Sequence, residues 1–563
     1  MKKLMVLLLS VFVVASVFAG GSSASSSGGT STGGGQKYTS LPFVTDGTKL
    51  TVYVGEATNN EVTSFDPKDN IFTAKVIKDT GINLEIITGE DSSGLSVLLN
   101  TGNYPDVIIS SMSYNDLLYY AGQGILRPLD EFNPLSSPNI KAAFDEYPAL
   151  NQILRGADGK LYALPTVNDC LHCIYSGGRA WYYMPWMRDN NIKQPQTLDE
   201  FTSYLRYVKT NDLNKNGKQD EIPIAFDAEG ARNFIAYIAK AYLPFVMGNY
   251  YGLAVENGKI VEQYKDPRFR EALKYLAGIY KEGLILSDSF TMSGDQMRGL
   301  AESPDPVVAI EGITWMNSYT THPSIRGTEK FVLPAIQGPN GQRNASNSDP
   351  WSILSAGYMI TDKCKDPALA IALYNYFINF EIEMDGYLGP KGTAWDYADP
   401  GTSSIIGQAS HKILWTFGQT PVNTSWGQGN PMIRNSKFRL GEQATGIDAI
   451  QKWYDTGDPS LQQQVLAAPA YKGEALWYIT SMQLSKYKMS DSLFIPPMAV
   501  NDADNARLAD INALLETYKD QAMVEFITGS RNIDNNTDWN TYLSELDRLG
   551  AAEMVQIRQK YLK

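Results

Sequence analysis

The segments TVYV (residues 51–54), NLEIIT (residues 83–88) and DVII (residues 106–109) decide the fold of this chain. Each is a short apolar run with the length of a buried strand, and a helical stretch ending near Lys78 separates the first two. A shorter helical stretch precedes the third. Strands that alternate with helices of this length predict βαβ units and a parallel sheet. We therefore predict an α/β fold.

Length and composition limit the function classes. The 563 residues exceed what one hydrophobic core organises, so at least two domains are expected. A net charge of −13 argues against a nucleic-acid partner, because phosphate binding needs clustered basic charge. Three cysteines exclude a disulfide-stapled scaffold. The aromatic content of 11% fits either a large aromatic core or a binding surface for flat apolar ligands such as sugar rings.

Several helix boundaries can be predicted from capping residues. Asp266-Pro267 and Asp366-Pro367 each supply an N-cap followed by proline at the first helical position. Thr197 and Glu200 have the spacing of a capping box. These residues are structural and carry no chemistry.

The first 46 residues predict export. Residues 1–19 have the charged start, apolar run and small cleavage-site residues of a signal peptide, and residues 20–46 form a flexible tether that begins GGSSASSSGG. A tether in this position usually follows a lipid-modified cysteine, but here Gly21 stands in its place. We expect a soluble, exported protein, periplasmic or extracellular, without a lipid anchor. No later stretch of sequence has the length and apolarity of a membrane span.

Four motifs carry a family resemblance. They are YPDVI (residues 104–108), DGKLYALP (158–165), LAGIYKEGLI (276–285) and FITG (526–529). In number and order they resemble extracellular solute-binding proteins of ABC importers, family 1-like, in the large lipoprotein-like branch that includes alginate-oligosaccharide-binding proteins. The resemblance runs from about residue 48 to the end.

The resemblance implies a type II periplasmic binding protein fold, in which two α/β lobes are joined by a hinge with several crossovers and hold the ligand in a cleft. By analogy, lobe 1 comprises residues 47–165 and 356–490, and lobe 2 comprises residues 166–355 and 491–563. The implied function is capture of a carbohydrate, expected to be an oligosaccharide, by a monomer that delivers it to an ABC transporter permease.

The loop NDLNKNGKQDEIP (residues 211–223) is a candidate calcium site. Oxygen side chains at alternate positions converge on a hard cation, and Gly217 permits the sharp turn. The usual glutamate at the twelfth position is replaced by Pro223, so Glu221 would have to close the shell. The resembled family has this loop as a structural calcium site, and the alternative is a solvated polar turn. The candidate ligands are Asp212, Asn214, Asn216, Lys218 (through its carbonyl), Asp220 and Glu221.

Cys170 and Cys173 have the spacing of a redox motif or of half a zinc site. The remaining Cys364 and the isolated histidines cannot complete four zinc ligands with paired spacing. A local disulfide or two buried thiols is therefore expected, with Cys364 as a single buried thiol.

Residues that follow predicted strands are candidate ligand contacts, because ligands in such folds meet the strand ends. In sugar-binding relatives, an aromatic residue after an apolar-Gly segment such as the one before Trp315 stacks on a sugar ring; anchoring its own lobe is the alternative. The other candidates have capping or surface roles as alternatives. They are Glu56, Ser110, Ser111, Asn168, Asp169 and Trp395.

Two other function classes stay open. A secreted carbohydrate-active enzyme would need a pair of carboxylates such as Asp169 and Asp396, but nothing in the sequence marks one pair out. No GxSxG, HExxH or phosphate loop is present, so we expect no enzyme. A binding protein that feeds a sensory receptor is indistinguishable from an importer by sequence.

Overall fold

The computed structural model describes residues 37–55, 62–89, 92–175, 177–247, 252–313, 318–320, 324–345, 350–414, 421–430, 432–468 and 475–562. The predicted signal peptide, most of the tether, and Gly21 lie outside these ranges. No helix in the described ranges has both the length and the apolarity needed to cross a membrane.

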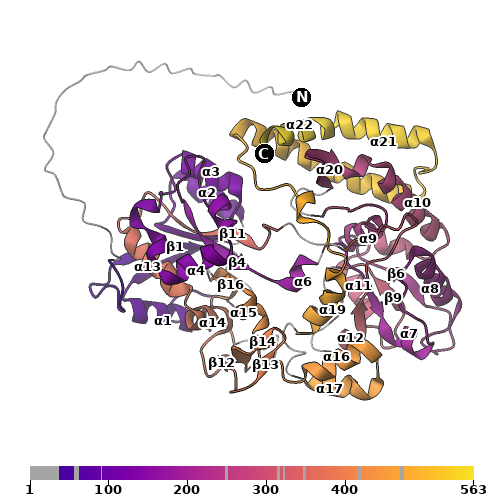
Figure 1. Ribbon diagram of the computed structural model, residues 1–563, viewed down its shortest axis with the longest axis horizontal. Coiled ribbons are helices and arrows are strands. Elements are labelled where there is room, and N and C mark those ends of the chain that lie inside the picture. Colours follow the sequence, from indigo (N-terminus) through magenta and orange to yellow (C-terminus); the bar gives the residue numbers. More distant parts are fainter. Residues whose placement is uncertain are drawn as a thin grey trace, which may run out of the picture. The chain divides into compact units, whose positions relative to one another are not determined.

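A six-stranded mixed sheet organises the first α/β lobe (Figure 1). Its strand order is β16-β4-β11-β3-β1-β2. Only β11 runs antiparallel to its neighbours β3 and β4, so the carboxyl ends of β1, β3, β4 and β16 share one edge with the start of β11. The strands are β1 Lys49–Val54, β2 Asn83–Thr88, β3 Val107–Met112, β4 Ala163–Asn168, β11 Leu354–Ile360 and β16 Ile433–Arg434.

The three strands predicted from the opening segments are confirmed as β1, β2 and β3. The parallel pairing of β1 with both β2 and β3 follows from the intervening helices. Buried apolar residues of these strands share a core with helices of the same lobe, which are α1 Ile71–Thr80, α2 Ser92–Thr101, α3 Tyr114–Gly122, α4 Pro138–Glu146, α5 Leu150–Ile153, α13 Pro367–Phe377 and α14 Phe380–Leu388. Helix α15 Ser436–Leu440 follows β16 and buries Phe438 in a separate small core with Met384.

A four-stranded sheet organises the second lobe, in the order β10-β5-β9-β6. Its strands are β5 Trp181–Tyr183, β6 Ile222–Ala225, β9 Val308–Glu311 and β10 Lys330–Val332. The helices that follow along the chain are α6 Leu171–Ile174, α7 Met184–Asp189, α8 Leu198–Thr210, α9 Gly230–Ala239, α10 Pro267–Lys281, α11 Gly294–Ala301 and α12 Ile325–Thr328. The predicted N-caps are confirmed at Asp266 and Asp366, and the capping box at Thr197 and Glu200.

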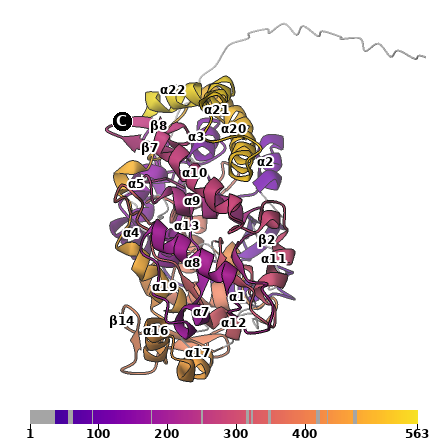
Figure 2. The ribbon, with the colours of Figure 1, turned by 90° about the vertical axis from the view of Figure 1, so that its right-hand side faces the viewer.

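The other strands of the described residues form two-stranded antiparallel sheets. They are β7 Leu253–Glu256 with β8 Lys259–Glu262, β12 Trp395–Tyr397 with β15 His411–Ile413, and β13 Ser403–Ser404 with β14 Gly407–Gln408. The C-terminal helices α20 Asp502–Thr528, α21 Asn536–Arg548 and α22 Ala551–Tyr561 pack on one another, as both ribbon views show (Figures 1 and 2). Their buried faces join the core of the second lobe.

The boundary expected near residue 490 needs correction. Helices α16 Ile447–Thr456, α17 Gln462–Ala467 and α19 Ala475–Ser485 bury their apolar faces in the second core, although residues up to 490 were assigned to lobe 1. Trp453 fixes this packing, because its ring lies beside Phe331 and its indole N–H donates to the carbonyl of Thr328 at 2.8 Å. The chain therefore leaves the first lobe soon after α15.

Candidate functional site

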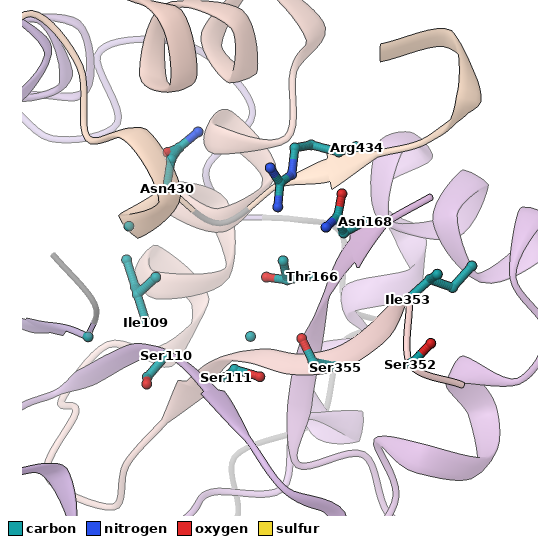
Figure 3. Close-up of a pocket in the computed structure, with 13 residues that line it drawn as sticks. Ile109, Ser110, Ser111, Thr166, Asn168, Ser352, Ile353, Ser355, Asn430 and Arg434 are labelled. Atoms are coloured by element: carbon teal, nitrogen blue, oxygen red, sulfur yellow. The ribbon is translucent and has the colours of Figure 1, made fainter. Parts of the chain in front are cut away.

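A polar pocket lies where the strands of the first sheet end (Figure 3). It is a cavity of about 200 Å³. Gly55 follows β1, Ser110 and Ser111 lie near the end of β3, and Thr166 and Asn168 lie in the last half of β4. The two residues before β11 and its first half supply Ser352, Ile353, Ser355 and Gly357. The segment that leads into and through β16 supplies Gly429, Asn430 and Arg434. The sheet thus brings side chains from distant parts of the sequence, between Gly55 and Arg434, to one site.

A bulge in β11 shapes the floor of the pocket. The register of β11 shifts between Ala356 and Tyr358 against both neighbouring strands, which places Gly357 in the irregular segment. A Cβ on Gly357 would lie 1.8 Å from the hydroxyl oxygen of Thr166. Glycine is therefore required there for Thr166 to lie between the two sides of the pocket, as Figure 3 shows.

Two asparagines in the pocket have buried side-chain atoms without a hydrogen-bond partner among the described residues. Asn430 is only 2% exposed, yet neither its Oδ1 nor its Nδ2 is bonded within the described chain. The Oδ1 of Asn168 is likewise buried and unbonded. An unsatisfied buried amide costs about 1–3 kcal/mol, so these groups point to a polar ligand that completes their bonds.

Arg434 contributes positive charge to this pocket. Its side chain is largely buried, and its guanidinium lies 5.2 Å from the ring centre of Tyr387. Figure 3 shows the guanidinium turned toward Thr166 and Asn168. The buried carboxyl of Glu383 accepts the N–H of Ile433 at 2.5 Å, and burial raises its pKa well above the usual range. Burial therefore favours the neutral form of Glu383.

Asp169 holds the neighbouring segment in place. Its backbone N–H donates to the carbonyl of Arg434 at 2.9 Å, and its carboxylate accepts from the hydroxyl of Ser436 at 2.6 Å. The hydroxyl of Tyr147 also donates to this carboxylate, and burial, followed by the negative charge of Asp169, raises the pKa of Tyr147. Asp169 therefore positions the strand that carries Arg434 and does not line the pocket itself.

A second cavity of about 490 Å³ adjoins the first, because both are lined by Ser111, Ser352 and Ser355. Its walls are more apolar, with Trp351 and Met112 from the first lobe and Ile495, Pro497 and Met498 from the segment before α20. The polar end pocket and the amphipathic cavity together form one elongated site. Such a combination suits a ligand with hydroxyl groups and apolar C–H faces.

The structure brings together three of the ligand residues predicted from sequence: Ser110, Ser111 and Asn168. Trp395 lies elsewhere, fully buried in a small core with Met384, and its indole N–H donates to Asp385 at 3.0 Å. Because no part of Trp395 reaches the surface, this residue is corrected from a ligand contact to a core residue. Glu56 and Trp315 lie outside the described residues.

Sequence reasoning missed Thr166, Ser352, Ser355, Asn430 and Arg434. Ser352 precedes β11 and Ser355 lies at its start, so the rule of examining residues after strands passes over both serines. Asn430 and Arg434 reach the site through β16, a two-residue strand without a sequence signal. The DGKLYALP motif, which ends one residue before Thr166, was the available indication for β4.

The loop between α8 and β6 has the donors of a calcium site, although two of its carboxylates accept backbone N–H groups and Asp220 accepts from the side-chain amides of Asn214 and Asn216. Asp212 accepts the N–H groups of Asn216 and Gly217, and Glu221 accepts those of Leu213 and Asn214 through Oε1. The Oε2 of Glu221 is buried and has no hydrogen-bond partner among the described residues, so this oxygen could bind a cation. Across the described part of the chain, no group of three or more His, Cys, Asp or Glu side chains is arranged to hold a metal.

Cys170 and Cys173 form a disulfide, which is one of the two arrangements predicted for this pair. Cys364 is a buried free thiol, as predicted. Burial raises the pKa of Cys364 to about 12, so its reactive thiolate is suppressed. Neither the disulfide nor Cys364 lines the pocket.

Residues 72–388 match the family model described as bacterial extracellular solute-binding protein. The chain belongs to this family. Among curated proteins, the fructooligosaccharide ABC transporter substrate-binding protein FusA of Streptococcus pneumoniae serotype 4 is 23% identical over 509 residues, which cover 88% of this chain and 87% of FusA. The family membership agrees with the resemblance found in the sequence motifs.

Two solved structures of family members show the same fold. An extracellular solute-binding protein from Bifidobacterium longum subsp. infantis superposes with a TM-score of 0.69 at 17% identity, covering 92% of this chain and 99% of the other. An EF-hand mutant of S. pneumoniae FusA in complex with fructo-nystose superposes with a TM-score of 0.66 at 19% identity, covering 91% and 98%. The two-lobe architecture is thereby established for this member of the family.

Proposed function

We propose that this solute-binding protein captures an oligosaccharide and delivers it to the permease of an ABC transporter. The observation that carries the proposal is the elongated site, in which hydroxyls and two asparagines with unbonded side-chain atoms line one end and a cavity bearing Trp351 forms the other. Amides and hydroxyls suit sugar hydroxyls, and an aromatic face suits the C–H face of a pyranose. The curated relative FusA, described as a fructooligosaccharide-binding protein, supports the same ligand class.

The length of the site favours an oligosaccharide over a single sugar. The polar pocket alone would be filled by about one sugar ring, and the adjoining cavity extends the site beyond it. We infer that the protein acts as an exported monomer without catalytic activity. The same proposal includes cleavage of the signal peptide and a mature chain that carries no lipid. A protein that feeds a sensory receptor is the alternative, and neighbouring permease genes would favour import over it.

A thermal-shift screen over mono- and oligosaccharides, amino acids and peptides tests the ligand class. A ligand that binds only the folded protein raises its melting temperature. Oligosaccharides should give the largest shifts. A shift with peptides or amino acids alone would show that the ligand is not a sugar.

We also propose a structural calcium ion in the loop of residues 212–221. The oxygen donors at alternate positions and the unpartnered Oε2 of Glu221 support it, as does the EF-hand named for the FusA structure. The ion would be held by the side chains of Asp212, Asn214, Asn216, Asp220 and Glu221 and by the carbonyl of Lys218. It would offset the repulsion among three carboxylates in a short loop and supply no chemistry to the ligand.

Chelation should therefore lower the stability of the protein. We expect EGTA to lower the melting temperature by about 2 °C or more, because an ion bound only to the folded state adds to the free energy of unfolding. Asp212→Ala should abolish this response, whereas Asp295→Ala, which removes an exposed aspartate from the first turn of α11, should retain it. If EGTA leaves the wild-type melting temperature unchanged and calorimetry detects no calcium uptake, the loop is a polar turn.

A further inference from the structure

The disulfide between Cys170 and Cys173 lies directly after a residue of the polar pocket. Asn168 lines the pocket as the last residue of β4, and its carbonyl accepts the backbone N–H of Cys170 at 2.7 Å. The side-chain Oδ1 of Asn168 is buried and has no hydrogen-bond partner among the described residues, so it can bond a ligand. A single residue, Asp169, therefore separates a side chain of the pocket from the disulfide.

The segment that holds the disulfide also carries the chain from the first core to the second. Val167 of β4 is buried in the core of the first lobe, whereas Tyr175 is buried in the core of the second. Between them, α6 contacts α19, and its Ile174 packs against the second core. The turn of residues 169–174 therefore links the pocket residue at the end of β4 to the second lobe.

The disulfide closes this turn. Helix α6 has four residues, which are too few for a helix to be stable through its own hydrogen bonds. Cys170 is the N-cap of α6, and its sulfur accepts the backbone N–H of Cys173, to which it is also covalently joined. A cross-link of this kind restricts the conformations of the turn and so holds the neighbouring groups in place.

Resting on the proposed function, we propose that the disulfide is a positioning element of the polar pocket, which holds Asn168 in the orientation that bonds the ligand. Reduction of the disulfide therefore weakens binding, although every residue that lines the pocket remains. Outside the cytoplasm, oxidising conditions keep the disulfide intact and the site in its binding form.

The reduction requires an external dithiol. A thiolate of the dithiol attacks one sulfur of the disulfide and forms a mixed disulfide with it. The second thiol of the reagent then closes the reagent's own disulfide, so that two electrons and two protons pass to the protein and leave two cysteine thiols. Cys173 is partly exposed, which gives a small dithiol access to the bond.

Calorimetry on the full chain with and without dithiothreitol tests the effect on binding. The probe is whichever of kestose, maltotriose, cellotriose and mannotriose gives the largest thermal shift. Reduction of the wild-type protein should weaken binding about 5-fold, which is the scale of ordering one side chain. An unchanged affinity, in a protein that alkylation and mass spectrometry show to carry thiols at both Cys170 and Cys173, would overturn the proposal.

Variants identify the disulfide as the source of the effect. The double variant Cys170→Ser and Cys173→Ser should bind as weakly as the reduced wild-type protein, and dithiothreitol should not change its affinity. Cys364→Ala is the matched control, because it removes the buried free thiol and leaves the disulfide in place, so its affinity should still fall on reduction. A double variant that binds like the oxidised wild-type protein would contradict the proposal.

A double-mutant cycle tests whether the disulfide acts through Asn168. In the Asn168→Ala background, reduction should change the affinity by less than about 2-fold, because the group that it displaces is already absent. Equal losses of affinity with and without the Asn168 side chain would show a general loosening of the fold and would contradict the positioning role.

Hydrogen exchange on the free protein separates this proposal from the proposed function. Reduction should speed the exchange of the backbone amides of Asn168 and Asp169 about 10-fold, whereas the amide of Val52 in β1 should be unaffected. Unchanged exchange at Asn168 and Asp169 would overturn the positioning role whether or not a saccharide binds. Faster exchange at these amides, together with failure of all four saccharides to bind, would count against the proposed function and support the positioning role.

Discussion

At the scale of single residues, two buried asparagines differ in what the folded protein offers them. Asn70 is 1% exposed, donates to the carbonyls of Ser64 and Ser425, and accepts the N–H of Thr73 as the N-cap of α1. Asn430 is equally buried, but both of its side-chain polar atoms lack a partner in the described chain. The first asparagine stabilises the fold, and the second is available to a ligand.

Substitution of each asparagine by alanine should therefore separate stability from binding. Asn430→Ala should change the free energy of unfolding by less than about 1 kcal/mol and weaken oligosaccharide binding by at least ~10-fold, because it removes unsatisfied groups. Asn70→Ala should cost about 2–3 kcal/mol, because it removes a helix cap and leaves buried partners unpaired. Denaturant unfolding and calorimetry measure the two effects. A large loss of stability in Asn430→Ala without loss of affinity would assign this residue to the fold.

His411 gives the fold a dependence on pH. It lies in β15, is largely buried, and shares a hydrogen bond with the hydroxyl of Ser410 at 2.9 Å. Burial, and to a lesser extent the positive charge of Lys437, lowers the pKa of His411 to about 4. The folded protein thus favours the neutral imidazole, and this stabilisation is complete above the unfolded pKa of about 6.5 and lost as the pH falls toward 4.

Replacing His411 by asparagine should remove that pH dependence. Between pH 7.5 and pH 4.5 the wild-type protein should lose about 2–3 kcal/mol more unfolding free energy than His411→Asn does, since asparagine carries no titrating group. Urea unfolding of both proteins at the two pH values measures the difference. Equal losses of unfolding free energy in the two proteins would show that protonation of His411 does not destabilise the folded state.

At the scale of elements, glycine has opposite roles in a strand and in a helix. Gly357 lies in the bulge of β11, where a Cβ would meet the hydroxyl of Thr166 at 1.8 Å and its backbone nitrogen at 3.0 Å. Gly278 lies on the exposed side of α10, where a Cβ would meet nothing within 4 Å. The first glycine makes room for a pocket residue, and the second only increases the flexibility of the unfolded chain.

Alanine at these two positions should therefore shift stability in opposite directions. Gly278→Ala should stabilise the protein by about 0.5–1 kcal/mol, because alanine lowers the entropy of the unfolded chain and favours helix. Gly357→Ala should destabilise it by about 1–3 kcal/mol through overpacking, and should weaken ligand binding by displacing Thr166. Unfolding experiments on both variants measure this, and a Gly357→Ala protein with unchanged stability and affinity would contradict the role given to the bulge.

The predictability of the elements follows from how local their signals are. Helix caps such as Asp266 and Thr197 act within four residues, so sequence alone locates them. The helices between residues 447 and 485 are amphipathic, but amphipathicity does not say which of two cores receives the apolar face, and their lobe was assigned wrongly. The prediction that Trp395 contacts the ligand was wrong for a related reason, because an aromatic residue near a glycine can face a core or a cleft equally well.

At the scale of the whole molecule, the alternation of strands and helices predicted the α/β class, and the motifs predicted the family. Part of the site was predictable as well, because Ser110, Ser111 and Asn168 lie at the ends of recognisable strands. The position of Arg434 was not predictable. Its strand, β16, pairs with β4 through only two residues, and more than 260 positions of sequence separate the paired residues. Long-range pairing of this kind leaves no local pattern.

The central claim is that the strand-end pocket of the first lobe binds the sugar. A crystal structure of the protein with the oligosaccharide that gives the largest thermal shift tests it most directly. We predict one sugar ring in this pocket, with its hydroxyls within hydrogen-bond distance of Asn168 and Asn430 and the rest of the chain extending toward Trp351. An oligosaccharide bound with high occupancy elsewhere, with the amides of Asn168 and Asn430 contacting no ligand atom, would contradict the claim.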